Sequence, residues 1–296
     1  MTSPNLPLAS DDGARLLAAY DAQLREESEV GASPRWDRDG PLVRAVFDDG
    51  EDGGFGFVTY RALTGYDGPA DGDALDALIA RTVQHYAAMP DVNGFEWKTR
   101  GHDAPSDLGD RLVAHGLVAE ELETVMVGEA ALLAVDVVLP AGVSLRRIGL
   151  TPDGSWQDED EVLADVSRAL AMQAEVFGSG GHQSAAALTR RILDHPELAE
   201  LWVAEATDGR DESVVVSAGR LDVVPGTQFA GIWGGSTLAP WRGQGIYRAL
   251  TAARARSALA KGVRYIHSDC SPDSRPILAR SGLLAITTTT PYVWRR

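Results

Sequence analysis

Apolar and polar positions along the first half of the chain predict alternating strands and helices. A helix begins near residue 11, with Leu16, Tyr20 and Leu24 on one face, and 31–40 has the composition of a loop. Further helices are predicted over 73–88 and 107–115, the second ending at Gly116. Short apolar or alternating runs predict strands over 42–47, 54–63, 94–99, 117–118 and 124–127.

The second half follows a similar plan. Helices are predicted over 159–176 and 184–193, with a long one ending at residue 260 and a short one at 280. Strands are predicted over 143–148, 201–206, 214–223, 229–238, 263–267, 283–288 and 290–294. This order indicates an α/β or α+β fold rather than a regular βαβ array.

An internal repeat supports two related halves. Residues 97–127 align without a gap on 263–293, and eight of the 31 positions are identical, where random pairing gives about two. The pairs include Asp103 with Asp269 and Gly116 with Gly282. Duplication is our preferred interpretation; the alternative is that two helix–glycine–strand units share only generic patterning.

Charge divides the chain at the same place. Residues 1–140 hold 26 acidic and 10 basic side chains, whereas residues 141–296 hold 17 of each. This asymmetry favours two domains, which we place at 1–135 and 140–296. A net charge of −16 argues against nucleic acid or anionic membrane as the main partner.

Other features point to a cytoplasmic chain without metal or membrane. The single cysteine, Cys270, excludes an internal disulfide and any multi-cysteine metal site. Residues 1–10 lack the basic and apolar regions of a signal peptide, and no run of 18 apolar residues exists. We therefore expect a cytoplasmic monomer or homodimer.

The most informative segment is the turn after the strand at 229–238. A helix starts at once after Arg242-Gly243-Gln244-Gly245, so backbone N–H groups and the positive end of the helix dipole face solvent together. The two glycines allow close approach of a phosphate, and nearby arginines add positive charge. A dinucleotide fingerprint would need glycine at Arg248, and a triphosphate loop would need a lysine that is absent. A pyrophosphate is the expected ligand; the structural alternative is a turn that only lets strand and helix pack.

The pattern Arg/Gln-x-x-Gly-x-Gly/Ala in this turn resembles the pyrophosphate loop of the GNAT N-acetyltransferase superfamily. It matches at Arg242 and Gly245 and departs at Tyr247, where the pattern has Gly or Ala. The resemblance covers about residues 142–296. It implies two tandem GNAT-like domains, each a mixed, mostly antiparallel sheet flanked by helices, with acetyl-coenzyme A (acetyl-CoA) as cosubstrate. The first half is interpreted as a degenerate copy, because 64–73 has Asp67, Asp71 and Asp73 where phosphates need cations.

The resemblance also implies site residues and direct acetyl transfer to the amine of a small molecule. Cofactor contacts fall on Thr237, Leu238, Arg242, Gly243, Gln244, Gly245, Ile246, Tyr247 and Ser271. The superfamily's usual acid, a tyrosine, is replaced by Leu278, so Ser274 is the candidate acid, with Ser271 and Cys270 nearby. A helix-capping role is the alternative for both serines.

The general base is open at this point. Asp269 is the first candidate, followed by Glu175 and His182, although the match of Asp269 with Asp103 also fits a structural role. Cys270 as a nucleophile has no convincing His/acid pair.

Aromatic residues near the expected site leave alternatives of their own. Trp156 and Trp233 suit the core better than an acceptor pocket, and Tyr292 reaches either the site or the other half.

Two other functions stay in view. One is a non-catalytic acyl-CoA-binding or regulatory protein, and the other is an acyltransferase with a different acyl chain or a hydroxyl acceptor.

Overall fold

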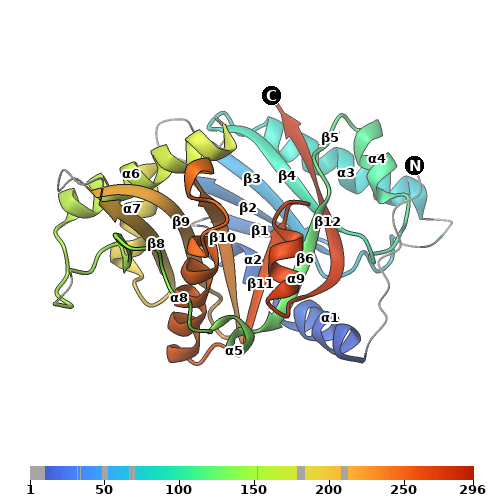
Figure 1. Cartoon of the computed structure of the whole chain (residues 1–296). Coiled ribbons are helices and arrows are strands. Elements are labelled where there is room, and N and C mark those ends of the chain that lie inside the picture. Colours follow the sequence, from blue (N-terminus) through green and yellow to red (C-terminus); the bar gives the residue numbers. More distant parts are fainter. Residues whose placement is uncertain are drawn as a thin grey trace. The chain divides into compact units, whose positions relative to one another are not determined.

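The computed structural model describes residues 11–31, 33, 35–48, 53–66, 68, 71–151, 153–178, 184–207 and 213–296. Contacts within the chain divide it into two compact units. Unit 1 comprises Met1–Val127, Asp269–Arg280 and Leu284–Arg296, and unit 2 comprises Gly128–Ser268 and Ser281–Leu283. Each unit combines a mixed sheet with helices, which confirms the predicted α/β (α+β) class (Figure 1).

Unit 1 is built on the strand order β1-β2-β3-β4-β12-β6, with β5 paired to β12. Only β3 and β4 run parallel. Its strands are β1 (Arg35–Asp39), β2 (Leu42–Asp48), β3 (Gly54–Tyr60), β4 (Val92–Arg100), β5 (Val118–Ala119), β6 (Glu123–Glu129) and β12 (Leu284–Arg295). Its helices are α1 (Asp11–Gln23), α2 (Glu27–Val30), α3 (Gly72–Ala87), α4 (Leu108–Ala114) and α9 (Arg275–Arg280).

Unit 2 has the order β7-β8-β9-β10-β11, and only β10 and β11 are parallel. Its strands are β7 (Val143–Arg147), β8 (Ala199–Thr207), β9 (Ser213–Val223), β10 (Phe229–Thr237) and β11 (Tyr265–Cys270). Its helices are α5 (Ala130–Leu133), α6 (Glu159–Phe177), α7 (Ala185–Asp194), η2 (Ala239–Trp241) and α8 (Ile246–Ala260). Both units thus contain an antiparallel meander followed by a parallel strand–helix–strand crossover, in agreement with two tandem domains of one fold.

The end of the chain is where the compact units and the sequence division differ. The sequence division gives all of residues 140–296 to the second half. By contacts, α9 and β12 belong to unit 1, where β12 lies between β4 and β6. The two predicted terminal strands are one continuous strand, β12.

Strand β1 was missed by sequence patterning because it has no apolar face. Residues Arg35–Asp39 fall in the predicted loop, and four of the five are exposed. The strand lies at the edge of the sheet, where Arg44 of β2 forms ion pairs with Asp37 (2.8 Å) and Asp39 (3.2 Å). Cross-strand charge pairs can stabilise such an edge, but they carry no hydrophobic period to detect.

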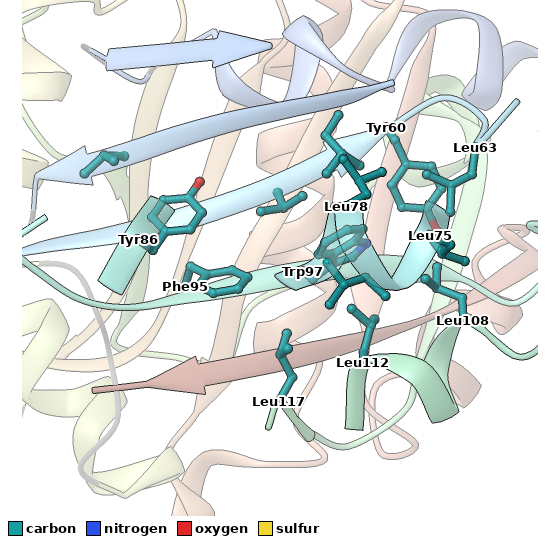
Figure 2. Close-up of a cluster of buried hydrophobic side chains, with 14 of the residues drawn as sticks. Tyr60, Leu63, Leu75, Leu78, Tyr86, Phe95, Trp97, Leu108, Leu112 and Leu117 are labelled. Carbon is teal, nitrogen blue, oxygen red and sulfur yellow. The ribbon is translucent and has the colours of Figure 1, made fainter. Parts of the chain in front are cut away.

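The core of unit 1 lies between its sheet and α3 and α4. Tyr60, Tyr86, Phe95 and Trp97 are fully buried there together with leucines of both helices (Figure 2). Tyr86 stacks on Phe95 with ring centroids 4.5 Å apart. Side chains alternate along a strand, so the positions of β4 next to Phe95 and Trp97 lie on the opposite face of the sheet.

Unit 2 has a core on each side of its sheet. Leu201 and Val203 of β8 pack with α6 and α7, whereas Ala204 and Ala206 pack with Ile246, the first residue of α8. Helix α6 starts with a capping box in which Asp158 and Glu161 bond each other's backbone N–H. The sheet on which α8 begins is thus packed on both of its faces.

Candidate functional site

The predicted phosphate turn is present in unit 2, between β10 and α8. Gly243 and Gly245 adopt left-handed backbone conformations, with φ of 75° and 82°. A Cβ atom at Gly243 would meet nothing within 4 Å, so the surface beside it is open. The turn therefore exposes main chain that a non-glycine side chain would cover.

Donors without acceptors are concentrated in the same segment. Among the described residues, no acceptor is found for the N–H groups of residues 243–248, whereas the next one, Ala249, donates to the Gly245 carbonyl at 2.9 Å. Helix α8 is 15 residues long, so its dipole adds positive potential at this end. These donors fit the diphosphate of a coenzyme A molecule.

Cations flank the turn. Arg242 and Arg248 are exposed, and the Arg242 Nε donates to the Thr237 carbonyl at 3.0 Å, which ties the turn to the end of β10. Arg256, further along α8, instead pairs with Asp136 at 2.7 Å and with the Val135 carbonyl. Arg242 and Arg248 are thus the arginines of this group that stay available to an anion.

Strands β10 and β11 separate next to the turn. Their parallel register covers only Phe229–Gly231 against Tyr265–His267, although β10 continues to Thr237. A bulge between Trp233 and Ser236 on the β9 side and a positive φ at Gly234 bend β10 at this point. The Gln173 side chain of α6 donates to the Gly234 carbonyl at 2.5 Å and holds the bend. The bend leaves a stretch of β10 without a partner on its β11 side, where an extended ligand can pair, while the other side stays paired with β9.

Tyr247, the departure from the superfamily pattern, is accommodated by a glycine. A Cβ atom at Gly235 would lie 2.9 Å from the Tyr247 ring, so the large side chain fits because β10 has none there. Burial lowers the pKa of Arg254, and the nearby Tyr247 opposes this effect. Gly219 makes room for Arg254 in the same way, since a Cβ there would lie 2.7 Å from the guanidinium.

The other predicted cofactor residues present main chain more than side chain. Ile246 is buried in the core, and Thr237 is buried and bonded to Ser217 at 2.9 Å. The Leu238 N–H donates to the Val216 carbonyl at 3.0 Å, and its carbonyl accepts from Trp241 at 2.9 Å. Gln244 is exposed and donates to the Pro240 carbonyl at 3.1 Å. The structure brings these residues together with the turn; their cofactor contacts stay predictions.

The predicted catalytic residues belong to unit 1. Asp269 lies at the end of β11, and its Oδ2 atom is 2.6 Å from Lys98 Nζ. Ser271 is exposed, and Ser274 directly precedes α9, with no capping bond from either hydroxyl in the described part of the chain. Leu278 is buried, in agreement with a packing role. Roles for Asp269, Ser271 and Ser274 in transfer stay predictions.

Other candidates are placed less favourably. Burial, assisted by the charges of Asp269 and Glu123, raises the pKa of the Cys270 thiol to about 11, so it is protonated at neutral pH and unsuited as a nucleophile. Glu175 is an exposed helix residue, and His182 lies outside the described residues.

The aromatic candidates divide differently. Trp156 is 51% exposed, so its assignment to the core was wrong; it stacks on Arg147 instead. Trp233 is half-buried against His267. Tyr292 packs on the unit 1 core beside α4.

The equivalent turn of unit 1 differs in charge. Its sequence includes Asp67, which lies outside the described residues, while Asp71 accepts from the Gly68 N–H at 3.2 Å. The nearby Arg111 is paired with Asp76 and Asp107, both at 2.9 Å. Arg111 is therefore already neutralised. That this half has no coenzyme A turn stays a prediction.

A parallel strand pair that separates beside a glycine turn and a helix N-terminus defines a GCN5-related N-acetyltransferase fold, here in tandem form. Solved structures agree. A GCN5-related N-acetyltransferase from Kribbella flavida superposes with a TM-score of 0.63 at 18% identity, covering 95% of each chain. A tandem GNAT protein from the clavulanic acid biosynthesis pathway gives 0.54 at 15%, covering 98% of this chain and 97% of that one. A GCN5-related N-acetyltransferase from Sphaerobacter thermophilus gives a TM-score of 0.54 at 16% identity, covering 86% of this chain and 76% of that one.

No protein-family model and no curated protein sequence matches the chain. At these identities the structural likeness establishes the fold. Among the described residues, no helix is long and apolar enough to cross a membrane, and no three His, Cys, Asp or Glu side chains are grouped to hold a metal ion.

Proposed function

We propose that the protein is an acetyl-CoA-dependent N-acetyltransferase that transfers the acetyl group directly to the amine of a small molecule. The observation that carries this proposal is a run of backbone N–H groups at the start of α8. The N–H groups of residues 243–248 have no acceptor among the described residues, and the run includes two left-handed glycines. Exposed arginines lie beside it. Main-chain donors at a helix N-terminus suit a diphosphate better than they suit a neutral ligand.

The chain's own residues would then divide the work. Acetyl-CoA would supply the thioester, with its acetyl carbon open to attack by the amine. The turn would hold the diphosphate end, and the stretch of β10 that has no partner on its β11 side would orient the pantetheine arm. Asp269 is the first candidate to accept the amine proton, and Ser274 the first to protonate the leaving sulfur. A coenzyme A thiolate can also leave unprotonated, because a thiol pKa near 8.5 is not far above neutral pH.

A second function, a non-catalytic acyl-CoA-binding protein, is favoured by one observation. Leu278 is buried at the position where the superfamily commonly has its tyrosine acid. A transferase with a longer acyl chain or a hydroxyl acceptor is the remaining alternative, with the same cofactor turn.

Two measurements separate these functions. Coenzyme A binding is measured by calorimetry, and coenzyme release from acetyl-CoA is followed with a thiol reagent across a panel of small amines. Binding with amine-dependent thiol release supports the transferase. Binding at micromolar concentration without release for any amine supports the non-catalytic protein, and absence of binding contradicts both.

A further inference from the structure

The sheet of unit 1 has one polar face, opposite the core of Figure 2. On β4, Glu96, Lys98 and Arg100 alternate with the buried Phe95 and Trp97, so the three charged side chains share that face. The register of β12 adds Glu123 of β6 to it, since Thr289 pairs with Arg100 on one side and with Glu123 on the other. The face therefore carries charge at positions that usually hold apolar residues.

Half of this charge is neutralised internally. Lys98 Nζ lies 2.6 Å from Asp269 and 3.3 Å from Glu29, and Arg100 pairs with Glu29. Burial opposes ionisation of Glu29, but Arg100 and Lys98 outweigh it and hold its pKa at about 2. Two cations and two anions thus form a closed network on the sheet.

Glu96 and Glu123 are the excess. Neither has a hydrogen bond or an ion pair with any residue that the structure describes. Both residues are partly exposed. Two carboxylates without a counter-charge, beside a network whose charges balance, leave this face with a negative potential.

A second observation is that the network balances its charges but leaves one hydrogen-bond acceptor unsatisfied. The Asp269 side chain is 7% exposed, and its Oδ1 atom is buried without a hydrogen-bond partner. The charge of Asp269 acts on Glu123, so the two carboxylates belong to the same cluster. An unsatisfied buried acceptor is costly, which indicates a donor that the described part of the chain does not supply.

We propose that Glu96, Glu123 and Asp269 form a binding site for an organic ammonium ion on the sheet of unit 1. Glu96 pairs with Val293 and Glu123 with Thr289, on opposite sides of β12. The four-residue offset along β12 corresponds to about 13 Å of strand. Carboxylates separated in this way suit an extended cation with two amino groups better than a single small ion. The inference deepens the proposed function, because an ammonium ion is the protonated form of an amine acceptor.

The titration of the two glutamates gives the site a pH dependence. Burial first, and then Glu123, Glu120 and Glu29, raise the pKa of Glu96 to about 7 against the opposing charge of Lys98. The pKa of Glu123 is also raised to about 7, by burial first and then by the charges of Asp269, Glu121 and Glu120. The charge of Lys98 again opposes this shift. A bound cation favours the ionised carboxylates, so binding near neutral pH should release protons and should tighten as pH rises.

Calorimetry on the full chain without acetyl-CoA tests the site, with 1,4-diaminobutane as the probe. Butylamine carries one ammonium and butane-1,4-diol none. We expect binding in the order diamine, monoamine, diol, with the diol not binding. The double substitution Glu96→Gln and Glu123→Gln should weaken the diamine at least about tenfold. Asp73→Asn also replaces a carboxylate by an amide, at an exposed position of α3, the helix that packs on the other face of the sheet. This control should leave the affinity for the diamine unchanged.

The outcomes separate this inference from the proposed function. Unaltered diamine affinity in the double glutamine variant, or diol binding equal to that of the diamine, overturns the ammonium site. Proton release at about pH 7, seen as a buffer-dependent heat that disappears in the double variant, supports it. Because coenzyme A is absent from these titrations, the site can fail while coenzyme binding holds, and the reverse.

Discussion

Substitution of Gly243 by alanine tests the phosphate turn against a matched glycine. Gly243 and Gly262 have nearly the same backbone, φ 75° and 78°, and a Cβ at either would meet nothing within 4 Å. Alanine in a left-handed conformation costs about 1–2 kcal/mol, so Gly243→Ala and Gly262→Ala should destabilise the protein to a similar extent. Only at Gly243 does the new methyl group stand where a phosphate would approach the main chain.

The expected difference lies in coenzyme affinity. If the methyl group displaces the phosphate from two N–H donors, at about 1.5 kcal/mol each, the loss is about 3 kcal/mol, or about a hundredfold in Kd. Calorimetry with coenzyme A measures affinity, and urea denaturation measures the shared destabilisation. Equal coenzyme affinities for the two variants would refute the assignment of the turn. A loss for both variants in proportion to their stability would refute it equally.

Three further outcomes follow from unit 1. Alkylation of Cys270 by iodoacetamide should be slow at pH 8 and accelerate toward pH 11, and rapid labelling at neutral pH would contradict its raised pKa. Asp269→Asn should destabilise the protein by about 3 kcal/mol because the buried Lys98 then keeps only the more distant Glu29 as a counter-charge, and Lys98→Met in the same chain should recover part of this in urea denaturation. In the folded protein the pKa values of Glu96 and Glu123 are raised from 4.5 to about 7, so these residues favour folding below pH 4.5 and this contribution is lost as pH rises to about 7. Glutamine at both positions should flatten the decline of the free energy of unfolding over this pH range. An unchanged slope of that free energy against pH would speak against the raised pKa values.

The sequence was sufficient for the elements whose pattern is local. The turn at 242–245 could be predicted because glycine, arginine and a helix start lie next to one another in the chain. The same holds for α3, predicted over 73–88 and found at Gly72–Ala87. A period of apolar residues is enough where a helix covers a core.

Features that depend on partners far apart in the sequence were missed. Gly235 accommodates Tyr247 across the strand–helix turn, and nothing in either residue alone indicates the fit. Glu96, Lys98 and Arg100 gave a signal that could have been used: charge at every second position of a strand predicts a polar sheet face. Their partner Asp269 could not be inferred, because it is 171 positions from Lys98.

Two aspartates that align in the internal repeat, Asp103 and Asp269, have similar ion pairs. Each neutralises a buried cation of unit 1, Arg25 at 2.8 Å and Lys98 at 2.6 Å. Asp269 differs in that one of its oxygens has no hydrogen-bond partner among the residues that the structure describes. The turns diverged in sign, with arginines around 243–245 and acids around 64–73. An acidic first half that had only lost an anion site would have no reason to bury unneutralised glutamates on its sheet, since each favours the unfolded chain above pH 4.5. Their retention at a cost in stability is what a site for a cation requires.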